Sequence, residues 1–89
     1  MRYALEIPEH LDKAFLKLSK RDKRQLEAIR GKVDEILENP SHYKPLKGDM
    51  YGARRVHIEG SFVLTFEIDE EKKIVRLLDY EHHDRVYKV

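Results

Sequence analysis

The sequence contains no cysteine and no long apolar run. Without cysteine, the 89-residue chain can form neither a disulfide framework nor a thiolate zinc site. No apolar stretch approaches the roughly 18 residues of a membrane-spanning helix, and the start, MRYALEIPEH, lacks the apolar centre of a signal peptide. We therefore expect a soluble cytoplasmic protein in which residues 1–89 form a single domain with a modest core.

Net charge is also nearly absent, but the charges are unevenly distributed. The chain has 18 Lys and Arg against 17 Asp and Glu, which gives a formal net charge of +1. Residues 13–55 hold twelve basic and six acidic side chains, whereas both flanking segments are acidic. A basic middle of this kind suits a surface that faces phosphate groups. A solvated helix face is the alternative explanation.

Hydrophobic periodicity predicts the order β-α-α-β-β-β. The predicted strands cover 2–7, 54–59, 61–68 and 74–80, and the predicted helices cover 8–18 and a segment that ends at Asn39-Pro40. Ser19 followed by Asp22 resembles the capping pair at the start of the second helix. We therefore predict an α+β fold. It has an N-terminal strand, an antiparallel helical hairpin and a three-stranded antiparallel meander, with the helices on one face of the sheet.

The predicted strand at residues 54–59 has two different faces. Val56 and Ile58 alternate with Arg55 and His57, so the apolar pair is expected to face the helices. Arg55 and His57 then lie on the opposite face. Charged and polar side chains in the middle of a sheet do not form a second core, so this face needs solvent or a ligand.

The last eleven residues, DYEHHDRVYKV, contain two adjacent histidines ahead of a tyrosine. They follow the final strand, and we expect His83 and Tyr87 to converge with His57 on one surface. A metal site made of His57, His82 and His83 is the weaker interpretation. Adjacent histidines on an extended chain project in different directions, and the sequence has no HxxxH or HExxH pair.

Metal-free cleavage of RNA suits these residue types better. That reaction needs a base for the 2′-hydroxyl, an acid for the leaving 5′-oxygen and cations for the charged phosphorane. Histidine side chains titrate near neutrality and serve as acid or base. Arginine and lysine bind phosphate, and tyrosine stacks on bases. None of these residue types is specific to a nuclease, and ordinary surface positions are the alternative.

Two segments of the chain resemble the RelE/ParE superfamily of toxins from type II toxin–antitoxin systems. They are PLKGDMYGARRVHIEGSFVLTFEI and YEHHDRVYKV. Their motifs are most similar to the YafQ branch, namely Leu46-Lys47-Gly48, a strand with His57, the aromatic strand Phe62–Phe66, and His83 ahead of Tyr87. The resemblance covers nearly the whole chain. It implies a toxin that cleaves messenger RNA, typically in the ribosomal A site, without metal or other cofactor.

The resemblance also implies roles for individual residues. His57 and His83 match catalytic histidines, Arg55 matches a basic position, and Tyr87 matches the terminal aromatic residue that contacts the substrate. As a mechanism, His57 would accept the 2′-hydroxyl proton and His83 would protonate the leaving oxygen, which forms a 2′,3′-cyclic phosphate. The further candidates for substrate binding are Lys44, Lys47, His82 and Arg85.

The resemblance further implies a protein partner. This partner is a small antitoxin whose extended or helical segment covers the apolar grooves between helices and sheet. Two alternatives stay open. A ParE-like toxin has the same fold but inhibits DNA gyrase. A toxin-fold binding protein with impaired catalysis would explain two departures from the YafQ pattern, because Lys44 stands in place of a histidine and Ser61 in place of an aspartate.

Overall fold

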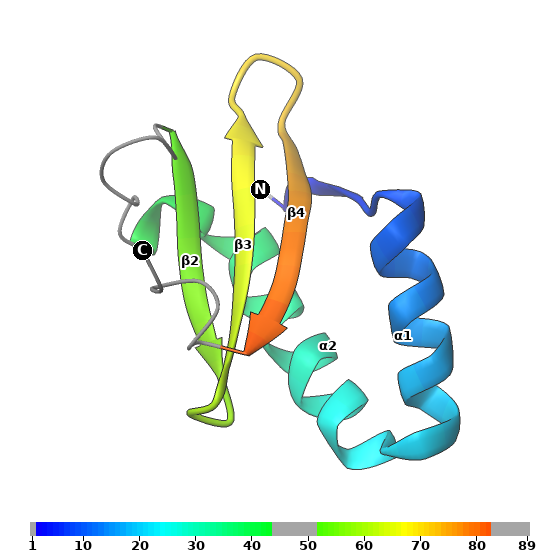
Figure 1. The fold of residues 1–89 in the computed structure, drawn as a ribbon. Helices are drawn as coiled ribbons and strands as arrows, with labels where there is room; N and C mark the ends of the chain where they lie inside the picture. Colours follow the sequence, from blue (N-terminus) through cyan, green and yellow to red (C-terminus); the bar gives the residue numbers. More distant parts are fainter. Residues whose placement is uncertain (1, 44–51, 83–89) are drawn as a thin grey trace.

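The computed structural model describes residues 2–43 and 52–82, which form a four-stranded sheet with two helices on one face (Figure 1). The elements are β1 (Ala4–Glu6), α1 (Glu9–Arg21), α2 (Lys23–Glu38), a 3₁₀ turn (Pro40–His42), β2 (Ala53–Ile58), β3 (Phe62–Asp69) and β4 (Ile74–His82). In space the strands follow the order β1-β4-β3-β2. The pair β1–β4 is parallel and the other two pairs are antiparallel. The predicted α+β fold is confirmed.

The junction between the helices differs from the prediction. α1 does not end at Leu18, and Ser19 lies inside it, where its hydroxyl donates to the carbonyl of Leu16 at 2.6 Å. The real N-cap of α2 is Asp22, whose carboxylate accepts the amide of Gln25 at 3.1 Å. The prediction of a helix start at Ser19 was wrong, because a serine hydroxyl can bond back to a carbonyl of its own helix without ending it.

The core lies between the sheet and the helices. α2 contributes a stripe at spacings of three and four residues, as expected for a helix that covers a sheet. The buried side chains of this cluster are Leu11, Ile29, Val33, Ile36, Leu37, Val56, Ile58, Leu64, Phe66, Val75 and Leu77. Each such side chain stabilises the fold by about 1.5–3 kcal/mol relative to an exposed one. Val56 and Ile58 therefore face the helices, as predicted.

Both helices are short and amphipathic. α1 has 13 residues and α2 has 16. In the part of the chain that the structure describes, no helix has the length and apolar character needed to span a membrane.

The C-terminal half of α2 is bound to the residues before β1, because Arg2 donates to Asp34 at 2.8 Å and to Glu38 at 3.3 Å.

Candidate functional site

Arg55 and His57 lie on the sheet face that the helices leave uncovered. Their neighbours Val56 and Ile58 are buried in the helix-facing core, and side chains alternate between faces along a strand. Arg55 is partly buried and His57 is exposed. Since both residues belong to the edge strand β2, they stand at one side of this face (Figure 1).

The adjacent strand β3 forms the floor beside these two residues. Arg55 pairs with Thr65 and His57 pairs with Val63. Thr65 and Val63 are only 2% and 0% exposed, although they lie on the face without helices. The Thr65 hydroxyl donates to the carbonyl of Asp79 at 3.3 Å, which satisfies its buried polar group. The floor is therefore poorly solvated, and charges beside it interact more strongly than they would in water.

A second arginine on this face is already neutralised. Arg76 of β4 donates to Glu67 of β3 and to Glu6 of β1, both at 2.7 Å. The hydrogen bonds to Glu67 and then to Glu6 raise the pKa of the Arg76 guanidinium above its ordinary value. Because two carboxylates already bind it, Arg76 is a poor ligand for a phosphate group.

His82, a predicted substrate contact, lies on the opposite face from His57. Its cross-strand partner is Phe62, and the two rings meet edge-on with centroids 5.5 Å apart. Phe62 in turn stacks on Tyr80 at 5.2 Å and packs against the helix-facing core. The predicted strand ended at Tyr80, but β4 continues to His82, and alternation along the strand directs its ring to the helix side. The structure thus does not bring His82 together with Arg55 and His57.

The other predicted site residues lie outside the described residues. They are Lys44, Lys47, His83, Arg85 and Tyr87. The convergence of His83 and Tyr87 with His57 therefore stays a prediction. Within residues 2–43 and 52–82, no three His, Asp or Glu side chains form a group that could hold a metal ion.

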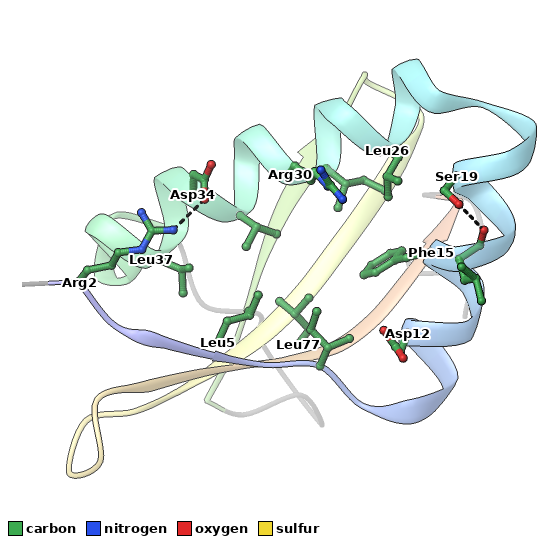
Figure 2. Close-up of a pocket in the computed structure, with 14 residues that line it drawn as sticks. Arg2, Leu5, Asp12, Phe15, Ser19, Leu26, Arg30, Asp34, Leu37 and Leu77 are labelled. Carbon is green, nitrogen blue, oxygen red and sulfur yellow. Dashed lines mark hydrogen bonds and ion pairs between the residues drawn. The ribbon is translucent and has the colours of Figure 1, made fainter.

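An apolar groove runs between β1 and the two helices (Figure 2). Its volume is about 470 Å³. Three of its lining residues are large apolar side chains with unusual exposure: Leu5 at 38%, Ile7 at 37% and Leu16 at 63%. The family resemblance implied apolar grooves between helices and sheet, but it did not single out Leu16. The available signal was that this leucine lies outside the buried stripe of α1.

Polar side chains also line the groove, namely Arg2, Asp12, Ser19, Arg30 and Asp34. At one end, Arg2 and Asp34 form the ion pair drawn in Figure 2. At the other end, the hydroxyl of Ser19 is bonded to the α1 backbone. Arg2, Asp34 and Ser19 already have partners within the chain, and most of the other lining residues are apolar, so the groove mainly offers apolar surface to another molecule.

Sequence comparisons identify the family. Residues 2–87 match the family model described as the ParE toxin of the type II toxin–antitoxin system parDE. An uncharacterised protein of Methanosarcina mazei is 55% identical over 85 residues, covering 96% of this chain and 99% of the relative. A candidate toxin of Methanocaldococcus jannaschii, RelE4, is 51% identical over 86 residues, covering 97% of this chain and 92% of the relative. The chain belongs to the RelE/ParE superfamily of type II toxins.

Solved toxin structures share its fold. The RelBE2 toxin–antitoxin complex of Mycobacterium tuberculosis gives a TM-score of 0.77 at 23% identity, covering 92% of this chain and 99% of the other. A mutant of E. coli RelE in the free state gives 0.77 at 24% identity, covering 96% and 87%. YafQ of E. coli gives 0.70 at 17% identity, covering 97% and 99%. The predicted resemblance is confirmed, with RelE and YafQ among the structural relatives.

Proposed function

We propose that this toxin is an endoribonuclease that cleaves messenger RNA without metal, in the ribosomal A site, and thereby inhibits translation in the cytoplasm. The observation that supports this most is the position of Arg55 and His57 on one sheet face. Residues two apart on a strand are about 7 Å apart along it. One phosphodiester can therefore contact both side chains, with the guanidinium holding phosphate oxygens and the imidazole accepting a proton.

In the proposed reaction, His57 accepts the proton of the 2′-hydroxyl and the 2′-oxygen attacks phosphorus in line. His83 protonates the 5′-oxygen as the bond from phosphorus to that oxygen breaks. The products are a 2′,3′-cyclic phosphate and a 5′-hydroxyl. Arg55 offsets the negative charge of the phosphorane. The remaining contacts to the substrate are assigned to Lys44, Lys47, Arg85 and, by stacking on a base, Tyr87.

Two described residues of suitable type are left out of this reaction. His82 packs on Phe62 at the helix-covered face, and we assign it a structural contact. Arg76 forms ion pairs with Glu6 and Glu67, so its positive charge is already neutralised and attracts a phosphate only weakly. Within the described part of the chain, the proposed site thus lies along β2.

The proposed partner is an antitoxin that covers the apolar groove. Among the structural relatives, RelE and YafQ of E. coli have been solved in the toxin–antitoxin complexes RelBE and DinJ–YafQ. In this chain, the exposed Leu5, Ile7 and Leu16 give an apolar segment of a second protein a surface to bury. Because a partner that binds only the folded toxin stabilises it, we expect a higher melting temperature in the complex than for the toxin alone.

Message cleavage on assembled ribosome complexes, mapped by primer extension, tests the nuclease. Wild type is compared with Arg55→Ala, His57→Ala and His83→Ala. His10→Ala is the matched control, because this exposed histidine lies on α1 and not on β2. We expect codon-spaced cleavage by wild type and by the control, and its loss in the three site variants. Full cleavage by His83→Ala contradicts the proposed acid. Because assembled ribosomes themselves need magnesium, EDTA is tested with free RNA as substrate, where cleavage that EDTA abolishes contradicts a metal-independent reaction.

The family model itself favours a second function, because it describes ParE toxins. In the resemblance given above, ParE-like members inhibit DNA gyrase. A supercoiling assay with purified gyrase separates the two functions. Inhibition of gyrase without cleavage of message would replace the ribonuclease proposal. Absence of both effects would leave a toxin fold that binds its partner with impaired catalysis.

A further inference from the structure

The connection between α1 and α2 concentrates positive charge. We define the basic corner as five exposed cations, Lys17, Lys20, Arg21, Lys23 and Arg24. The one carboxylate among them belongs to Asp22, which is occupied as the N-cap of α2. Within residues 2–43 and 52–82, none of the five cations forms an ion pair with a carboxylate.

Several cations elsewhere on the described surface form ion pairs with carboxylates. Lys13 pairs with Glu9 at 3.1 Å, Lys32 with Glu35 at 3.4 Å, and Arg2 with two carboxylates of α2. Carboxylates are thus placed within reach of cations over much of the molecule. At the basic corner Asp22 is the one carboxylate among the five cations, so their mutual repulsion is compensated by a single negative charge.

The order of charges along α2 also opposes the dipole of the helix. α2 begins with Lys23 and Arg24, has no acidic residue in its first turn and has no basic residue in its last turn. The N-terminal end of a helix is the positive end of its dipole, so cations there destabilise it. α1 has the favourable order, with an acidic first turn and a basic last turn. Lys23 and Arg24, which oppose the dipole of α2 beside the basic last turn of α1, are explained more simply by contact with another molecule than by folding.

The basic corner lies at the end of the sheet where His57 lies. The side-chain amide of Gln25, in the first turn of α2, donates to the hydroxyl of Tyr80. The next residue, Glu81, pairs with Val63, which pairs with His57 on the other side of β3. Figure 1 shows the turn between the helices at the same end of the molecule as the β2–β3 turn, and Figure 2 shows it beside the end of β4. A strand of RNA at His57 can therefore continue around this end to the corner.

We propose that the basic corner binds the phosphate backbone of RNA at a place separate from the reacting phosphate. This inference rests on the proposed function, because it names a further contact of the same nuclease. Residues 16–24 contain no aromatic side chain, so the corner has no aromatic ring that stacks on bases. Its contacts are then to phosphates and independent of base sequence. Ribosomal RNA and the message itself share this chemistry.

The test compares two variants with the same change of net charge. The corner variant combines Lys20→Gln, Arg21→Gln, Lys23→Gln and Arg24→Gln. The control variant combines Lys13→Gln, Arg30→Gln, Lys32→Gln and Lys72→Gln, which also removes four cations, of which Lys32 is partly buried and the other three are exposed. Equilibrium binding of each full-length toxin to 70S ribosomes, and to a short single-stranded RNA, is measured at several salt concentrations. Circular dichroism melting confirms that both variants are folded.

We expect the corner variant to bind ribosomes about tenfold or more weakly at 0.1 M salt and the control variant to bind nearly as wild type. The plot of log binding constant against log salt should become shallower by about 3 for the corner variant, at about 0.7 for each lost phosphate contact. A loss on ribosomes alone assigns the contact to ribosomal RNA. A similar loss on the short RNA assigns it to the message. Both results support the corner as an RNA contact.

Equal losses in the two variants would overturn the inference, because net charge alone would then explain binding. Wild-type RNA binding by the corner variant, combined with weakened binding of the antitoxin, would also overturn it and assign the corner to a protein partner. The proposed function is judged separately by cleavage. If the wild-type toxin cleaves message and the corner variant binds RNA as tightly as wild type, only the proposal for the basic corner is refuted. If the wild-type toxin binds RNA but does not cleave it, the proposed nuclease is refuted.

Discussion

The two faces of the sheet are built from the same strands but have different chemistry. On the helix-covered face, Ile58, Leu64 and Phe66 are 1%, 0% and 0% exposed and belong to the core. On the other face, β2 presents Arg55 and His57 at alternate positions. Residues one position apart thus belong to a hydrophobic core and to the proposed site.

The difference indicates that stability and activity can be changed separately in this small domain. Core residues are held by dispersion and by removal of apolar surface from water. Arg55 and His57 project away from that core, so their removal leaves its packing intact. Substitutions on one face of the sheet, and then on the other, test this separation of stability from activity.

The largest expected effect is on the helix-covered face. Phe66→Ala should destabilise the toxin by about 3–5 kcal/mol, because it leaves a cavity at the centre of the core. Total stabilities of small domains are about 5–15 kcal/mol, so the variant should be largely unfolded under mild conditions. Urea denaturation followed by circular dichroism measures this. A loss below about 1 kcal/mol would show that Phe66 is not packed as the structure describes.

On the other face, His57→Ala should reduce cleavage and leave stability unchanged. Loss of a general base slows a reaction by about 10²–10⁴-fold, whereas an exposed substitution changes stability by no more than about 0.5 kcal/mol. Single-turnover cleavage on ribosome complexes and urea denaturation of the same preparation give the two values. Comparable loss of stability and activity would contradict the separation of the faces.

The groove on the helix side is a third region that should affect binding alone. Leu16→Ser should weaken the toxin–antitoxin complex by about 1.5 kcal/mol, or about tenfold in Kd, because an apolar contact is lost. Leu16 is 63% exposed, so the free toxin should melt as wild type. Isothermal titration calorimetry with the antitoxin measures the change, and Leu16→Met serves as the apolar control. Equal Kd values for the serine and methionine variants would exclude Leu16 from the interface.

The smallest expected effect is a loss of stability at alkaline pH. Burial is the largest cause that raises the pKa of the Tyr80 phenol above the ordinary tyrosine value of about 10. The unfolded chain therefore loses this proton at lower pH than the folded chain does. The stability that Tyr80 contributes is fully present below the pKa of this phenol in the unfolded chain. It falls as the pH rises from that pKa to the higher pKa of the folded chain. Melting curves between about pH 8 and about pH 11 test this. In Tyr80→Phe the decline should be shallower, and an identical pH profile would exclude Tyr80 as a cause.

Much of the fold was predictable because its determinants are local. The apolar stripe of α2 and the alternation along β2 each follow from the period of one element. They sufficed to place Val56 against the helices and His57 on the other face. The start of α2 was not predictable from the same signals, because Ser19 and Asp22 are both good caps by residue type. The choice depends on whether the hydroxyl of Ser19 finds a carbonyl of its own helix, as it does here.

The sequence by itself determined the order of the elements, the faces of β2, the family resemblance and the residue types available for phosphate chemistry. The tertiary structure alone decided which of those residues share a surface. It extended β4 to His82 and turned that ring onto Phe62, and it bound Arg76 between Glu6 and Glu67. The physical reason is that periodicity arises from neighbours in sequence. Neutralisation of a charge and the register between strands depend on residues far apart in the chain.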